Sequence, residues 1–252
     1  MRSSWPERAQ AAGSDRGTPL IPLRDDNPSE LRPVVSVALL VVCVVVFLWQ
    51  AGLDARGLER VFFSLGAIPA VLTGDVRLDP QLVRVPAWLS VFTSMFVHGG
   101  WFHLAGNMLY LWIFGDNVED AFGHLRFAAF YAACGAMAVA AQVMPDPHSQ
   151  VPMVGASGAV SGVLAAYLLL YPRARVLVAI PLGFYLDVRR LPAVIVLVLW
   201  FVIQLASSLL GDGREGVAFR AHVGGFVAGM LLTPFLRRPG IPLFRYTRIE
   251  RQ

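Results

Sequence analysis

Long apolar stretches separated by short polar ones dominate the chain from residue 34 onward. The first, residues 34–50, is a nearly unbroken apolar run. Five more follow, each close to the minimum of roughly 17 residues for a membrane-spanning helix: residues 101–114, 127–144, 155–171, 193–210 and 221–236. The pattern predicts an all-α membrane protein built as a bundle of six transmembrane helices.

The segments outside these stretches have different patterns. Residues 1–33 mix Pro, Ser, Gly and charges of both signs without apolar periodicity, which predicts a disordered tail. Residues 34–236 are then a single membrane domain, and residues 237–252 a C-terminal tail. Residues 61–72 and 176–186 are apolar but too short to span a membrane, and a proline interrupts each, so we expect interfacial or re-entrant segments there.

Composition and charge support a membrane location. Of the 252 residues, 56% are hydrophobic and only 15% charged, which excludes an ordinary soluble globule. All 21 basic residues are arginine. With six spans, 15 arginines lie on the side of the two termini and 6 on the other, so the positive-inside rule places both termini in the cytoplasm. All-arginine usage and the absence of a sorting signal favour the plasma (inner) membrane of a bacterium.

Neither nucleic acid nor a metal is an expected partner. No basic stretch is interleaved with aromatic residues, as nucleic-acid binding would require, so the lipid bilayer is the expected surroundings. Cys43 and Cys134 lie inside apolar runs, without the spacing of metal ligands. We therefore expect no metal and no cofactor.

Placing a polar side chain inside a membrane span costs free energy, so such residues in the predicted spans are candidates for a functional site. They gather in residues 98–107, 155–162 and 221–229. His103 and Asn107 are four residues apart and share one helix face, where they could donate to an oxyanion or simply hydrogen-bond a neighbouring helix.

Ser157 and His222 are candidates for a nucleophile and its base. Ser157 opens a glycine-rich helix, whose free N–H groups favour negative charge. His222 opens the sixth span, and six-span topology places both residues near the same, extracytoplasmic end. Pairs of glycines four apart on the two spans favour close packing, which could bring His222 within reach of Ser157: Gly158 and Gly162, and Gly225 and Gly229.

This set of residues fits acyl transfer. Ser157 would attack a carbonyl, His222 would take and return the proton, and His103, Asn107 and the Ser157 amide would bind the oxyanion. The last span has no acidic residue, so a dyad is the economical interpretation. A transporter would line a path across the bilayer, whereas these groups cluster on one side. A lipase or acyltransferase would use the same chemistry, although the Gly-x-Ser-x-Gly pattern is not met.

Four motifs together resemble the rhomboid family of intramembrane serine proteases: HGGWFHLAGN (98–107), FGDNVED (114–120), GASG (155–158) and AHVGG (221–225). The resemblance implies a six-helix bundle, a dyad of Ser157 and His222, and oxyanion donors at His103 and Asn107. It also implies that the substrates are transmembrane proteins, cut in or near their membrane segments. His98 matches the family's additional loop histidine, with a structural role, and Gly155 belongs to the motif before the nucleophile.

The sequence departs from the family pattern at two places. Many members carry an aromatic residue four positions after the serine, against which the histidine stacks, but here that residue is Ser161. Many also have a Trp-Arg pair in the first loop, whereas Trp88 precedes Leu89. The alternative to a protease is a non-catalytic rhomboid-like protein that binds membrane proteins, for which loss of Ser157 or His222 would be expected.

Overall fold

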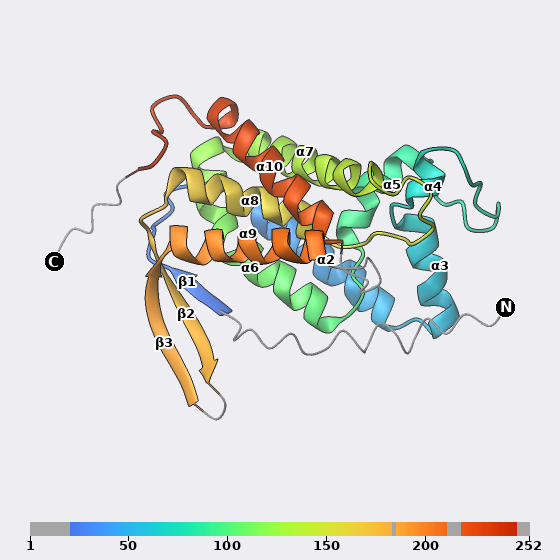
Figure 1. The fold of residues 1–252 in the computed structure, drawn as a ribbon, viewed down its shortest axis with the longest axis horizontal. Helices are drawn as coiled ribbons and strands as arrows, with labels where there is room; N and C mark the ends of the chain where they lie inside the picture. Colours follow the sequence, from blue (N-terminus) through green and yellow to red (C-terminus); the bar gives the residue numbers. More distant parts are fainter. Residues whose placement is uncertain (1–20, 183–184, 211–217, 246–252) are drawn as a thin grey trace.

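The computed structural model describes residues 21–182, 185–210 and 218–245, and this part of the chain is mostly helical (Figure 1). A long helix forms at each predicted apolar stretch: α2 (Val34–Ala51), α6 (Trp101–Phe122), α7 (His124–Val143), α8 (Ser157–Leu170), α9 (Ala193–Leu210) and α10 (Phe219–Leu236). By length and composition, α2, α7 and α10 can each cross a membrane. The count of six spans stays a prediction.

A three-stranded antiparallel sheet corrects the all-α prediction. Its order is β1 (Ile21–Asp25), β2 (Arg175–Leu182) and β3 (Tyr185–Pro192), and it lies at one end of the helices (Figure 1). The described part of stretch 176–186, which was expected to be interfacial or re-entrant, thus belongs to the paired strands β2 and β3. The stretch favours a strand because β-branched residues alternate along it, at Val176, Val178 and Ile180, and the two valines are fully buried.

The N-terminal segment also differs from its prediction, because the described residues 21–33 are ordered against the bundle rather than disordered. β1 pairs with β2, and Glu30 N–H donates to the Asp120 carboxylate on α6 at 3.0 Å. The completely buried Glu119 carboxylate accepts from the backbone N–H groups of Val35 and Ser36, at 2.9 and 2.8 Å. Glu119 therefore caps α2 by bonding N–H groups that lack partners within the helix. Residues 1–20 lie outside the described residues.

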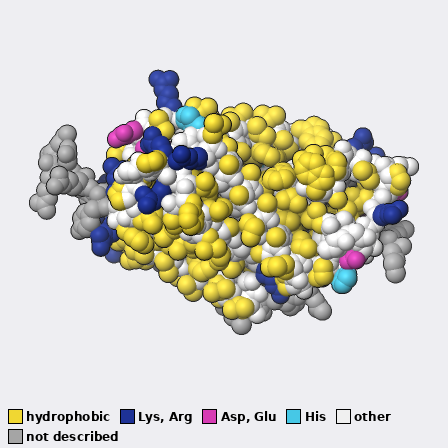
Figure 2. Space-filling view, turned by 90° about the horizontal axis from the view of Figure 1, so that it is seen from above, with side chains coloured by type: hydrophobic (Ala, Val, Ile, Leu, Met, Phe, Trp, Pro, Cys, Tyr) yellow, Lys and Arg dark blue, Asp and Glu magenta, His cyan; other side chains and the backbone are white. Residues whose placement is uncertain are grey.

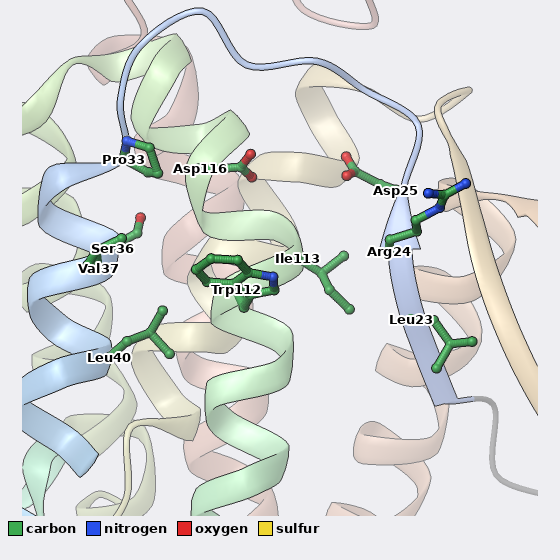
Figure 3. Close-up of a pocket in the computed structure, with 10 residues that line it drawn as sticks. All are labelled: Leu23, Arg24, Asp25, Pro33, Ser36, Val37, Leu40, Trp112, Ile113 and Asp116. Carbon is green, nitrogen blue, oxygen red and sulfur yellow. The ribbon is translucent and has the colours of Figure 1, made fainter.

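A small pocket of about 180 Å³ lies where this segment meets α2 and α6 (Figure 3). Asp25 and Asp116 stand at its polar end, with Leu40 and Trp112 on its apolar walls. Burial raises the pKa of Asp25 to about 6, although a hydrogen bond from the Tyr167 hydroxyl partly opposes the shift. Docking of β1 therefore places a carboxyl group where its charge is disfavoured.

Short helices cover the opposite end of the molecule: α3 (Ala55–Leu65), α4 (Pro69–Leu72), α5 (Ala87–Thr93) and the 3₁₀ turn η1 (Ser94–Phe96). The Asp54 side chain caps α3 by accepting from Gly57 N–H at 2.8 Å. Pro69 occupies the first turn of α4, where a missing N–H costs nothing. The predicted interfacial stretch 61–72 is thus the end of α3 followed by α4.

The surface between the two ends is largely apolar. Figure 2 shows one face covered mainly by hydrophobic side chains, with charged groups gathered toward the ends of the long axis. Val45 and Leu48 on α2, and Val202 and Ile203 on α9, are at least half exposed. Water would oppose such exposure over a broad face, whereas lipid would not. The chain is accordingly an integral membrane protein.

Candidate active site

Close contact between α8 and α10 places the two candidate catalytic residues. A Cβ on Gly225 would lie 2.0 Å from Gly158 O, and one on Gly229 would lie 2.4 Å from Gly162 O. Only glycines therefore allow these backbones to approach so closely. Ser157 begins α8, His222 lies in the first turn of α10, and Ser157 Oγ is 2.8 Å from His222 Nε2.

Gly155 shapes the turn that leads into α8. Its φ of +118° is unfavourable for any residue with a side chain, and its N–H donates to Ser94 O at 2.9 Å. A Cβ on Gly155 would lie 2.5 Å from His103 Nε2. Glycine at this position thus lets the His103 ring reach the turn just before Ser157.

His103 and Asn107 lie one turn apart on α6, as predicted. His103 Nδ1 accepts from Gly99 N–H at 3.3 Å, so in a neutral ring the proton is on Nε2, the atom beside Gly155. Asn107 is buried, and its amide donates to His103 O at 2.8 Å. That bond uses one of its two amide hydrogens. Both side chains therefore carry donors on the predicted face.

His98 lies beside His103 and has a structural role. Its side chain is buried, and its ring is 5.3 Å from that of His103 in an edge-to-face arrangement. Burial lowers the pKa of His98 to about 4, so its ring is neutral at pH 7. Gln50 at the end of α2 donates to His98 O and accepts from His98 N–H, both at 3.1 Å. Gln50 was not predicted from the sequence. The signal that could have identified it is its place as an amide residue at the end of an apolar run.

A second missed amide contacts His222 directly. Gln204 Oε1 on α9 is 2.7 Å from His222 Nδ1. Trp200, one turn earlier on α9, has its ring 6.1 Å from the imidazole, and Phe219 meets the imidazole edge-on at 6.3 Å. The sequence signal that could have identified Gln204 is its side-chain amide within the strongly apolar stretch 193–210.

Ser161 does not reach the imidazole. Its side chain is fully buried, and its hydroxyl donates to Ser157 O at 2.6 Å. The ring contacts that the family pattern expects from position 161 come instead from Trp200 on α9 and Phe219 on α10. The departure from the family pattern therefore leaves the imidazole with aromatic neighbours.

The arrangement suits nucleophilic chemistry. His222 Nε2 can accept the hydroxyl proton of Ser157 while Nδ1–H donates to Gln204. Ser157 also stands at the first position of α8, where backbone N–H groups have no partner within the helix and the helix dipole favours negative charge. A serine, a base and anion-stabilising donors thus converge at one end of the bundle.

Comparisons with known proteins agree with the motifs. A model of the Rhomboid domain matches residues 85–239, which include every candidate site residue. RHOMBOID-like protein 5 of Arabidopsis thaliana is 29% identical over 62% of this chain and 46% of its own length. Rhomboid protease GluP of Bacillus subtilis is 29% identical over 64% of this chain and 28% of its own length. Rhomboid-like protease 5 of Toxoplasma gondii is 32% identical over 68% of this chain and 18% of its own length. The chain thus spans half or less of these three relatives.

Proposed function

The chain belongs to the rhomboid family, and on that premise we propose that it is an intramembrane serine endopeptidase that cleaves peptide bonds in or near transmembrane segments of other membrane proteins. The main support is the 2.8 Å contact between Ser157 Oγ and His222 Nε2, which links a nucleophile to a base. A rhomboid-like protein that only binds its partners would not need this contact.

The reaction proceeds through an acyl-enzyme. Ser157 Oγ attacks the scissile carbonyl carbon while His222 Nε2 takes the hydroxyl proton. Three groups donate hydrogen bonds to the resulting oxyanion: the Ser157 backbone N–H, His103 Nε2–H and the Asn107 side-chain amide. His222 then protonates the leaving amine as the C–N bond breaks. Water, activated by the same imidazole, hydrolyses the ester and restores Ser157.

The same proposal includes the membrane arrangement. The six long helices all span the bilayer, with both termini in the cytoplasm of a bacterium and the start of α8 and α10 toward the extracytoplasmic side. The asymmetry of the 21 arginines supports this orientation. Exposed apolar faces on α2 and α9 would lie against lipid, through which transmembrane substrates reach the site.

The test is reaction of the detergent-solubilised chain with a fluorophosphonate, followed by intact mass. We expect one adduct on the unaltered chain and none on Ser157→Ala or His222→Ala. Ser149→Ala, which removes a loop hydroxyl, is the matched control and should react normally. In vesicles, only the reactive variants should cleave a reconstituted single-span substrate. Labelling of Ser157→Ala, or no labelling of a folded unaltered chain, would overturn the proposal, and the second result would favour the non-catalytic alternative.

A further inference from the structure

Gln204 contacts the ring nitrogen of His222 that does not contact Ser157. Its Oε1 is 2.7 Å from His222 Nδ1, while His222 Nε2 is 2.8 Å from Ser157 Oγ. The three side chains therefore form a continuous hydrogen-bonded line across α9, α10 and α8. We propose that Gln204 is a positioning residue, whose side-chain oxygen keeps His222 in the orientation and tautomer that can take the proton of Ser157; this inference rests on the proposed function.

The tautomer decides whether His222 can act as a base. A neutral imidazole has one N–H and one nitrogen with a free lone pair. With Gln204 Oε1 as acceptor, Nδ1 carries the hydrogen and Nε2 presents its lone pair to Ser157. The other tautomer would direct an N–H at the Ser157 oxygen and could not accept its proton. In serine proteases with an acidic third residue, losing the correct tautomer costs about 10⁴-fold in rate.

A neutral acceptor suits this part of the molecule. A buried charge without full compensation is costly in a membrane, whereas an amide oxygen orients the ring without one. Within the described residues, His222 makes its side-chain hydrogen bonds to Gln204 and Ser157, neither of which is charged. Among the described residues, His103 on α6 is a titratable side chain that interacts electrostatically with His222. The structure thus gives the dyad a third member that is an amide rather than a carboxylate.

Trp200 adds an independent indication that α9 faces the imidazole. It lies one turn before Gln204, so the two share one face of the helix. Its ring is 6.1 Å from that of His222 and 6.3 Å from that of Phe226, both on α10. Gln204 therefore projects from the face of α9 that packs on α10, and its contact with His222 follows from helix packing.

The experiment compares Gln204→Met with Gln204→Glu in the full chain in detergent. Methionine keeps the length of the side chain but lacks an acceptor, and glutamate restores one. The second-order rate of fluorophosphonate labelling is measured between pH 5 and 9. Gln142→Met, the same change on α7 at a side-chain oxygen without a hydrogen-bond partner among the described residues, is the matched control. Melting temperatures in detergent establish that each variant is folded.

We expect Gln204→Met to label at least about 10-fold more slowly than the control at every pH. Gln204→Glu should recover the rate at high pH, with the midpoint of its rate–pH curve moved upward, because a carboxylate stabilises the imidazolium. ¹⁵N spectra of labelled histidine should show His222 protonated on Nδ1 in the unaltered chain, and a mixture of tautomers in Gln204→Met.

Two results would overturn the inference. One is a folded Gln204→Met that labels at the control rate. The other is a slow Gln204→Met whose rate Gln204→Glu neither restores nor shifts in pH, since packing alone would then explain the loss. If the unaltered chain never reacts at Ser157, the proposed function fails, while the ¹⁵N spectra still decide whether Gln204 sets the tautomer.

Discussion

Replacing Gly225 by alanine should separate α10 from α8 and disable the site. The added Cβ would lie 2.0 Å from Gly158 O and 2.8 Å from Gly158 C, both of which are backbone atoms. No side-chain rotation can relieve such a contact. Ordinary van der Waals contact begins near 3.4 Å, so the two helices must move apart locally by about 1.4 Å.

That displacement acts one turn from the proposed base. The contact between Ser157 Oγ and His222 Nε2 is 2.8 Å, and lengthening it by a comparable amount takes it beyond hydrogen-bond reach. General-base assistance contributes roughly 10²- to 10⁴-fold, so we expect labelling of Ser157 to slow by at least about 100-fold. Overpacking should also cost about 1–3 kcal/mol of stability.

The assay measures the labelling rate by intact mass and the melting temperature in the same detergent. Gly52→Ala is the matched control, because a Cβ there meets its nearest atom at an ordinary 3.5 Å. It should leave both quantities unchanged. If Gly225→Ala labelled within about twofold of the control and melted at the same temperature, the two helices could separate without consequence, and the link from glycine packing to the site would be wrong.

Two further predictions concern an oxyanion donor and a buried carboxyl group. Asn107→Ala should lower the rate of substrate cleavage by about 100- to 1000-fold, since it removes one donor, and should lower the melting temperature only slightly, through loss of the hydrogen bond to His103 O; an unchanged rate would exclude Asn107 from the site. Asp25 has a raised pKa of about 6 when folded against 3.8 unfolded, so the folded state binds the proton more tightly and stability should rise as pH falls from 7 to 4. The gain is at most about 3 kcal/mol, from about 1.4 kcal/mol per pKa unit. In Asp25→Asn the melting temperature should lose this rise; equal pH dependence in both proteins would contradict the assignment.

The positions of the long helices could be predicted because apolar length decides them locally. Helices formed at all six predicted stretches, although α6 runs on to Phe122, beyond the predicted end at residue 114. The extension carries Asp120, which accepts from Glu30 in the N-terminal segment, and Glu119, which accepts from Val35 and Ser36 at the start of α2, 83 to 90 residues earlier in the chain. Charges at the end of an apolar stretch mark a boundary in the sequence, and only the fold reveals that they are buried and bonded.

The sheet could not be predicted for a related reason. Hydropathy alone counts residues 176–186 as a short apolar piece, although the alternation of β-branched residues at Val176, Val178 and Ile180 is typical of a strand. β1 is only five residues long and pairs with β2 across more than 150 positions of sequence. No local pattern in so short a segment identifies a partner at that distance.

The candidate site, likewise, could be predicted only in part from the sequence. Ser157 and His222 could be paired from the sequence because the glycines on their helices predict close approach, and the helices start at the same end of the bundle. Gln204 could not be paired with His222, since nothing local states which face of α9 packs on α10. The departure at Ser161 likewise pointed to an unsupported imidazole, whereas Trp200 and Phe219 contact it from outside the motif.

His222 is therefore held by two sets of contacts, and mutations in the two sets should have different effects. On one side, α8 is almost wholly buried, and its glycines touch the backbone of α10, so a change there must alter folding and reactivity together. On the other side, α9 exposes Val202 and Ile203 and reaches the imidazole through single side chains. A change at Gln204 can thus alter the protonation of His222 while leaving the packing of α8 and α10 intact. Comparing melting temperature with labelling rate separates the two kinds of support, because substitutions on the first side should lower both and those at Gln204 only the rate.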